Sequence, residues 1–408
     1  MNSDFKSKIQ RYPRLIWMIK RTLIIGVCVG VSYLTLLWLA DTRSVPLSNV
    51  LVIAGNKAFS ARNDSVGTVS YNLALFLNDD LNEASDQCYS DITRKEYELA
   101  VGSCSKVIEI DPNYAVGYFR RGYAYLYSHQ YDLAIADFTN DIEIIPIATR
   151  SYINRGSAYS SQKKYDQAIA DFTKSISINP KEAQAYLNRG LAYIQKAQFE
   201  LATSDCNKAI ELEKKFWNAY TCIGLVFMSQ GKYELALSNF DKAIELAPNT
   251  GNPYFVRGSF YDVQGKKDLA LADYTRAIEL DINYGTAYFN RGVIHVAQKE
   301  YDLAFSDFNK AINIDPTYAD AYLQRGNVFA DTKKFSDAIA DYQRAIALTS
   351  DTDANSYIYC VEGVTYTKMG NFEAAIPALE QGVKLNIMNH YDWCKPVLEN
   401  ALKGIPTP

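Results

Sequence analysis

Hydrophobic residues recur at steps of three and four along most of the chain, which predicts amphipathic helices. One unit extends from Ala115 to Pro146, where two such runs are separated by His129 and Gln130. Pro146 ends the second run, because proline has no amide hydrogen to donate and disfavours helical geometry in the preceding residue. The pattern therefore predicts two helices joined by a short turn.

This unit repeats with a constant period of 34 residues. A small residue marks each helix, where we expect the two helices to approach closely. On the first helix it is a glycine: Gly122, Gly156, Gly190, Gly224, Gly258, Gly292 and Gly326. On the second helix it is an alanine: Ala134, Ala168, Ala202, Ala236, Ala270, Ala304 and Ala338. Self-similarity at this period predicts a solenoid, in which each unit buries its apolar face against its neighbours.

The repeat resembles the tetratricopeptide repeat family in the tyrosine four residues before each glycine, from Tyr118 to Tyr322, and in the alanine, aromatic and proline that follow. The resemblance implies an all-α fold, a right-handed superhelical solenoid of helical hairpins. It covers about nine units at residues 81–388, of which seven are regular at 115–350. A capping helix is expected from Asn389 to Lys403, within a C-terminal segment at 389–408.

The residue before the glycine departs from the family pattern. It is usually leucine there, but six units of this chain have arginine, and an aspartate follows each arginine after sixteen residues. Units that lack the arginine also lack the aspartate, so we predict a salt bridge between the helices of each hairpin. Alternatively, the arginines could form a ladder that reads an acidic partner. The pairs are Arg121 with Asp137, Arg155 with Asp171, Arg189 with Asp205, Arg257 with Asp273, Arg291 with Asp307, and Arg325 with Asp341.

Residues 22–40 are an uncharged run that, as a helix, is about as long as a bilayer core is thick. A helix that is apolar on all sides must be buried or lie in lipid. We expect one transmembrane helix here, with a segment at 41–80 that links it to the array and packs on the first unit. The alternative is a cleaved signal peptide, although Trp38 and Ala40 make a poor cleavage site.

Charges around this run favour one orientation. The tail at 1–21 carries Asp4 and a cluster of basic residues: Lys6, Lys8, Arg11, Arg14, Lys20 and Arg21. The positive-inside tendency places this tail in the cytoplasm and the array outside it, as in a single-pass inner-membrane protein. Mitochondrial import receptors with this repeat set a contrary precedent, because their amino-terminal anchor leaves the solenoid in the cytosol.

Six cysteines outside the apolar run could form disulfides if the array lies in an oxidising compartment. The first pair would join two helices of one unit, the second would join a helix to the next unit, and the third would join the last unit to the cap. As small apolar side chains, they could equally fill core positions. The pairs are Cys88 with Cys104, Cys206 with Cys222, and Cys360 with Cys394.

Little in the repeats points to catalysis or to a cofactor. His129, His295 and His390 fall in different units, and none has metal-ligand spacing to a cysteine or carboxylate partner. The net charge is −4, and no basic stripe for nucleic acid is present. We therefore expect no enzymatic activity, no metal, no cofactor and no nucleic-acid partner.

What remains is a surface for another polypeptide. The residues just after the tyrosine and the glycine of each first helix share one side, which lines the concave face in the family that this chain resembles. This groove reads as apolar and nearly uncharged, which favours an apolar or aromatic segment over the terminal carboxylate of a chaperone. Neighbouring helices could instead cover these side chains. Its apolar members are Phe119, Tyr123, Ile153, Leu187, Leu191, Leu225, Phe255, Phe289, Val293 and Leu323.

We therefore expect a membrane-tethered scaffold that binds a protein or peptide through this groove, with the anchor raising the local concentration. Two alternatives remain. One is an accessory subunit of a membrane-bound enzyme or secretion complex that docks through its outer face. The other is a cytosol-facing receptor of the organelle-import type.

Overall fold

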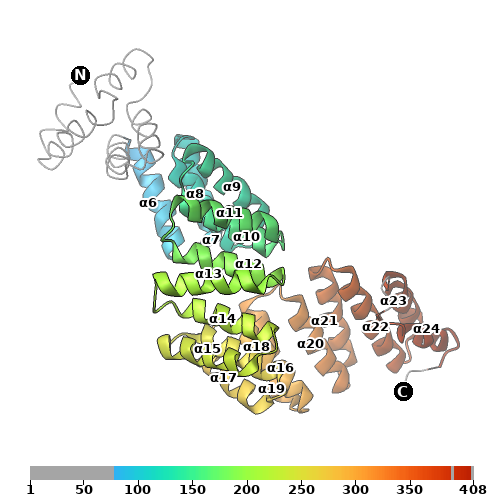
Figure 1. Cartoon of the computed structure of the whole chain (residues 1–408). Coiled ribbons are helices and arrows are strands. Elements are labelled where there is room, and N and C mark those ends of the chain that lie inside the picture. Colours follow the sequence, from blue (N-terminus) through green and yellow to red (C-terminus); the bar gives the residue numbers. More distant parts are fainter. Residues whose placement is uncertain (1–77, 387–389, 406–408) are drawn as a thin grey trace, which may run out of the picture. The chain divides into compact units, whose positions relative to one another are not determined.

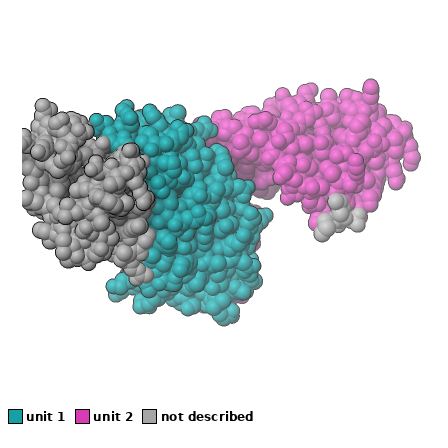
Figure 2. Space-filling model, turned by 90° about the horizontal axis from the view of Figure 1, so that it is seen from above, with its two compact units in different colours: residues 1–226 teal, residues 227–408 magenta. Residues whose placement is uncertain are grey.

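The computed structural model describes residues 78–386 and 390–405, and within these residues it contains helices and no strand (Figure 1). The all-α class is therefore confirmed for this part of the chain. The chain is divided into two compact units: unit 1 ends at Val226, and unit 2 begins at Phe227 (Figure 2).

Unit 1 is built from helical hairpins that follow one another in chain order. Each hairpin packs on the next through its second helix, which contacts the first helix of the following pair. The helices are α6 (Asp79–Thr93) and α7 (Tyr97–Ile110), α8 (Ala115–Tyr127) and α9 (Tyr131–Ile144), α10 (Thr149–Ser161) and α11 (Tyr165–Ile178), and α12 (Ala183–Gln195) and α13 (Phe199–Leu212). Helix α14 (Trp217–Ser229) contains the division between the units.

Unit 2 continues the same pattern and ends in a single short helix. Its helices are α15 (Tyr233–Leu246), then α16 (Gly251–Val263) with α17 (Lys267–Leu280), α18 (Gly285–Ala297) with α19 (Tyr301–Ile314), α20 (Ala319–Asp331) with α21 (Phe335–Leu348), α22 (Thr352–Lys368) with α23 (Phe372–Leu385), and α24 (Cys394–Leu402).

The turn inside each hairpin places one residue in the left-handed region. His129, which the sequence pattern places between two helices, has a φ of 60°, and the amide of Gln130 then donates to the carbonyl of Tyr125 at 2.8 Å. This geometry closes the helix end by bonding the next amide back to an unpaired carbonyl. The corresponding residues are Lys95, Lys163, Ala197, Gly231, Gly265, Lys299, Lys333 and Gly370.

The repeated glycine lets the two helices of a hairpin approach closely. A Cβ atom at Gly156 would lie 2.6 Å from the ring of Phe172, and one at Gly326 would lie 2.7 Å from the ring of Tyr342. Such distances are shorter than carbon atoms tolerate, so the aromatic residue of the second helix occupies the space that a side chain would need. Ala134 and its counterparts in the described hairpins are completely buried.

At the two ends of the chain, one prediction differs from the structure and the other falls on residues outside those described. The capping helix α24 begins at Cys394, later than the predicted Asn389, because a turn precedes it in which the amide of Tyr391 donates to Oδ1 of Asn386 at 3.2 Å. The predicted transmembrane helix at 22–40 lies outside the described residues. Among the helices that the structure does describe, none has the length and apolar content that crossing a bilayer requires.

Candidate functional site

The predicted salt bridge is present in all six repeats that carry both the arginine and the aspartate. In each, Nε and Nη2 of the arginine donate to the two carboxylate oxygens of the aspartate, at 2.7 to 2.9 Å. The third nitrogen reaches back to the preceding second helix, as from Arg155 Nη1 to Thr139 Oγ1 at 3.0 Å. The aspartates are buried. Because the arginine forks are already paired inside the array, the geometry argues against a ladder that reads an acidic partner.

Two of the repeats that lack the arginine carry a different buried carboxylate. In the first hairpin, Asp91 accepts from Ser103 Oγ at 2.7 Å and from Gln87 Nε2 at 2.6 Å. In the last hairpin, Gln343 Nε2 donates to Oε1 of Glu362 at 3.0 Å, and burial raises the pKa of Glu362. Asp91 was not predicted because it stands outside the arginine and aspartate register, whereas Glu362 takes the place of the arginine before Gly363 and was given no role.

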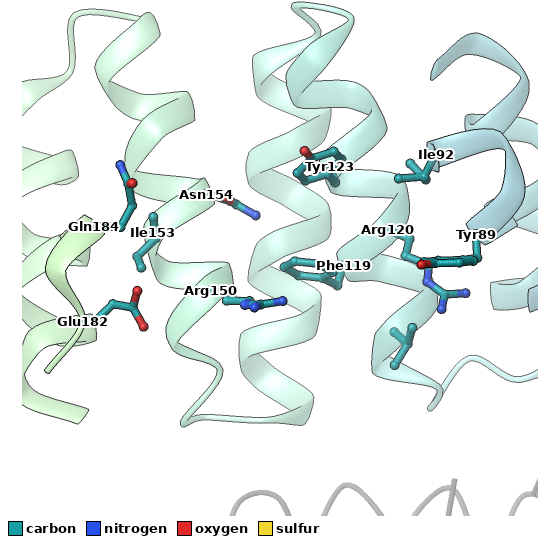
Figure 3. Close-up of a pocket in the computed structure, with 11 residues that line it drawn as sticks. Tyr89, Ile92, Phe119, Arg120, Tyr123, Arg150, Ile153, Asn154, Glu182 and Gln184 are labelled. Carbon is teal, nitrogen blue, oxygen red and sulfur yellow. The ribbon is translucent and has the colours of Figure 1, made fainter. Parts of the chain in front are cut away.

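A cavity of about 550 Å³ opens on the inner face of unit 1, which we define as the side formed by α6, α8, α10 and α12 (Figure 3). Phe119 and Tyr123 lie one turn apart on α8 and form its centre, with Tyr89 of α6 on one side and Ile153 of α10 on the other. Three of the predicted groove residues, Phe119, Tyr123 and Ile153, therefore line one cavity.

This cavity is more polar than the sequence analysis expected. Arg120, Arg150 and Glu182 also line it, so the prediction of a nearly uncharged groove was wrong here. The reason is helical periodicity, since the residue three before each predicted position shares its face. That step leads from Phe119 back to Val116 and from Ile153 back to Arg150, and it could have been applied to the sequence.

Arg120 and Arg150 differ in their partners from the arginines that pair with aspartate. Arg120 Nη1 donates to the carbonyl and hydroxyl oxygens of Ser85, at 2.8 and 3.0 Å, and its guanidinium lies over the ring of Tyr89. Burial lowers the pKa of Arg120. Arg150 is exposed at the cavity edge. In the part of the chain that the structure covers, neither arginine forms an ion pair.

A second cavity, of about 570 Å³, adjoins the first and shares Val116, Phe119 and Arg150 with it. Ala148, in the loop between α9 and α10, forms part of its wall. We call the two cavities together the Phe119 pocket. Each lies in the size range of typical ligand sites.

Asp141 of α9 is a buried acid in the wall of this pocket. Its carboxylate accepts a hydrogen bond from the hydroxyl of Ser151. Burial raises the pKa of Asp141 to about 7, and the bond from Ser151 offsets this only in part. Three later pairs of positions carry alanine at both: Ala209 with Ala219, Ala277 with Ala287, and Ala311 with Ala321. The pair of Asp141 and Ser151 was not predicted from the sequence.

The remaining predicted groove residues divide into covered and open positions. Neighbouring helices bury Leu187 and Leu323, and Ile153 is also only 7 % exposed. Leu191 and Val293 are exposed, and Leu191 lines a third cavity of about 470 Å³ in unit 1. Leu225 is half-buried. The alternative that neighbours cover the groove therefore holds at some positions and fails at others.

In unit 2 the two predicted aromatic residues are packed under tyrosines of the following hairpin. The ring centroids of Phe255 and Tyr284 are 4.9 Å apart, and those of Phe289 and Tyr318 are 5.0 Å apart. Phe289 also packs on Phe308 of its own hairpin, at 5.9 Å. These rings belong to the core of unit 2 as much as to its inner face.

The structure joins the three predicted cysteine pairs. The Cα atoms of each pair are separated by 4.8 Å for Cys88 and Cys104, 6.1 Å for Cys206 and Cys222, and 5.7 Å for Cys360 and Cys394. These separations lie in the range that disulfides require. The first pair joins α6 to α7, the second joins α13 to α14, and the third joins α22 to α24.

The histidines lie apart and contact different groups. His129 Nδ1 lies 2.9 Å from the hydroxyl of Tyr131, and His390 Nδ1 lies 3.1 Å from Oδ2 of Asp353. His295 Nδ1 lies 2.7 Å from Oε2 of Glu300. Residues 78–386 and 390–405 contain no group of three histidine, cysteine, aspartate or glutamate side chains placed to hold a metal.

Models of the tetratricopeptide repeat match most of the array. Those described as tetratricopeptide repeat match residues 103–136, 149–182, 183–216, 217–250, 252–283, 319–352 and 356–386, and one described as TPR repeat matches 294–333. No curated protein matches this chain.

Several solved structures are similar to this chain. The Cut9–Hcn1 hetero-tetramer of the APC/C is 17% identical with a TM-score of 0.52, over 87% of this chain and 76% of that one. A tetratricopeptide repeat protein from Parabacteroides merdae is 22% identical with a TM-score of 0.49, over 58% and 94%. PilF of Pseudomonas aeruginosa is 17% identical with a TM-score of 0.47, over 53% and 96%. The likeness to Cut9–Hcn1 supports the helical repeat fold.

Proposed function

The chain belongs to the tetratricopeptide repeat family, and on that premise we propose that it is a membrane-tethered scaffold that binds a partner polypeptide through the inner face of unit 1. Repeats of this family imply a scaffold for protein–protein interaction. The observation that carries the proposal is the Phe119 pocket, where Phe119 and Tyr123 form the centre and Arg150 is exposed at the edge (Figure 3). An apolar centre with a polar rim is the usual anatomy of a protein interface.

A photo-crosslinking amino acid at single positions of the full chain, in its native membrane, tests this proposal. We expect adducts with a partner from position Tyr123, in the pocket, and none from position Leu201, which is half-exposed on the second helix α13. Ala148→Tyr should abolish the adducts from Tyr123 by filling the pocket. Adducts from Leu201 alone would contradict binding through the inner face.

One observation favours the second candidate, an accessory subunit that docks through its outer face. Leucines recur as the third residue of the second helices, and about half of each side chain is exposed. Exposed apolar side chains in register can form a docking surface for another chain. The same two crosslinker positions, Tyr123 and Leu201, distinguish the two functions, since this candidate predicts adducts from Leu201. The row consists of Leu99, Leu133, Leu201, Leu235, Leu269 and Leu303.

We also propose that the anchor lies at residues 22–40 and that the array lies outside the cytoplasm. The basic tail at 1–21 and the three cysteine pairs support this placement, because disulfides persist in oxidising compartments. Protease added to each side of native membranes should digest the array only from the outside. In the denatured, unreduced chain, a thiol reagent should modify only Cys28. Modification of all seven cysteines would overturn the oxidising placement.

A further inference from the structure

In unit 2, tyrosine side chains of the protein itself fill the space above the inner-face phenylalanines. Twenty-nine residues after Phe255 stands Tyr284, and at the same distance after Phe289 stands Tyr318. Each tyrosine packs its ring against the phenylalanine, at centroid distances of 4.9 and 5.0 Å. At the same distance after Phe119 stands Ala148, which has no ring to offer, and a cavity of about 570 Å³ lies between these two residues.

The wall of the open position favours a hydrocarbon ring. In unit 2 the amide of Asn252 donates to the hydroxyl of Tyr284 at 3.0 Å, so a polar side chain there satisfies the phenol. The corresponding residue in unit 1 is Val116, which lines the pocket and offers no side-chain hydrogen bond. A buried hydroxyl without a partner loses free energy, so a phenylalanine ring suits the position better than a tyrosine ring.

The charges beside the open position favour a carboxylate. Arg120 and Arg150 both line the pocket, and within the described residues neither forms an ion pair, whereas each arginine of the salt-bridge series holds an aspartate. Two acids also line the pocket: Glu182 in the first cavity and Asp141, which accepts a hydrogen bond from Ser151, in the second. A guanidinium in a partly buried site gains most from a carboxylate that accepts its hydrogen bonds.

We infer that the partner segment of unit 1 carries a phenylalanine-type ring with an acidic residue beside it in sequence. The ring takes the place above Phe119 that Tyr284 takes above Phe255, and the carboxylate pairs with Arg150 at the rim. This inference rests on the proposed function, since it names the chemistry of the polypeptide that the same pocket would bind.

Short synthetic peptides with blocked ends provide the test, titrated against the full chain in lipid nanodiscs. The probe has the sequence Gly-Glu-Phe-Glu-Gly, and its controls replace the phenylalanine by alanine or both glutamates by glutamine. We expect the alanine control to bind at least tenfold more weakly and the glutamine control several-fold more weakly. Ala148→Tyr should remove the preference for the ring. Arg150→Gln, at an exposed position, should remove only the preference for glutamate.

Tyr284→Ala supplies a matched control in unit 2. It should open a second position for the ring above Phe255, but the residues that correspond there to Arg120 and Arg150 are Val256 and Thr286. The new site should therefore bind the glutamate and glutamine peptides equally.

Equal binding of the phenylalanine and alanine peptides by the native chain would overturn the inference, as would binding that Ala148→Tyr leaves unchanged. If these peptides fail while crosslinks from Tyr123 still capture a partner, the inner-face function stands and only its stated chemistry falls. Crosslinks from Leu201 alone would remove the proposed function whatever the peptides do.

Discussion

The inner faces of the two units differ in what covers their phenylalanines, while the framework of the two units is the same. In both units, arginine and aspartate pair across each hairpin with the same two hydrogen bonds. In unit 2, however, Tyr318 covers Phe289, whereas in unit 1 Ala148 leaves Phe119 beside an open cavity. A repeat can therefore keep its framework constant and open a cavity where the covering side chain is small.

The largest expected effect concerns the buried acid of the Phe119 pocket. Burial raises the pKa of Asp141 to about 7, from an ordinary value of 3.8. Between these values the folded chain binds more protons than the unfolded chain, so the free energy of unfolding falls as the pH rises, and the loss is complete above pH 7. Asp141→Ala with Ser151→Ala reproduces the alanine pair of unit 2. Between pH 4 and pH 8 the native chain should lose about 4 kcal/mol relative to this variant.

Urea unfolding at both pH values measures this difference. The comparison cancels the titration of groups that the two chains share. Parallel pH profiles for the native and double-variant chains would show that Asp141 is not buried as a neutral acid.

The next effect tests whether the shared framework is equally important in both units. Asp171→Ala in unit 1 and Asp341→Ala in unit 2 each leave an arginine without its carboxylate, and each should lower the free energy of unfolding by about 3 kcal/mol. Replacing Arg155 by leucine together with Asp171→Ala should cost less, because no unpaired charge remains. Urea unfolding tests both statements, and a double variant as unstable as the single one would refute the second.

The difference in unfolding free energy between two phenylalanine variants is expected to be smaller, about 2 kcal/mol, and it measures directly how well each ring is covered. Phe289→Ala removes a ring packed between Phe308 and Tyr318, and should cost about 3 to 4 kcal/mol. Phe119→Ala removes a ring that faces a cavity, and should cost about 2 kcal/mol less. Equal losses in thermal or urea unfolding would mean that Phe119 is covered in solution.

The smallest expected effect comes from exchanging the covering side chains of the two units. Ala148→Phe should stabilise unit 1 by about 1 kcal/mol, because the new ring can pack on Phe119 as Tyr284 packs on Phe255 and adds no hydroxyl that needs a partner. Tyr284→Ala should destabilise unit 2 by at least as much. Unfolding by urea gives both values, and a destabilising Ala148→Phe would indicate that the pocket cannot accept a ring.

Much of the framework could be predicted from the sequence because its contacts are local and repeat in register. Arg155 and Asp171 are sixteen residues apart, on the two helices of one hairpin, so the period alone places them opposite each other. Gly156 and Phe172 follow the same rule. The groove was predicted less well. Arg150 was missed because only two positions of each first helix were assigned to the inner face, although helical periodicity adds a third.

The sequence by itself determined the helical hairpins, their period, and the pairing of arginine with aspartate, because each depends on spacing within one unit. Only the tertiary structure decided which side chains of the inner face are open, since the cover for Phe119 or Phe289 comes from the next hairpin. It also decided the acidity of Asp141, because the pKa of a carboxyl depends on how completely neighbouring helices exclude water from it. Coverage and desolvation are properties of packed neighbours, and no single segment of the sequence carries them.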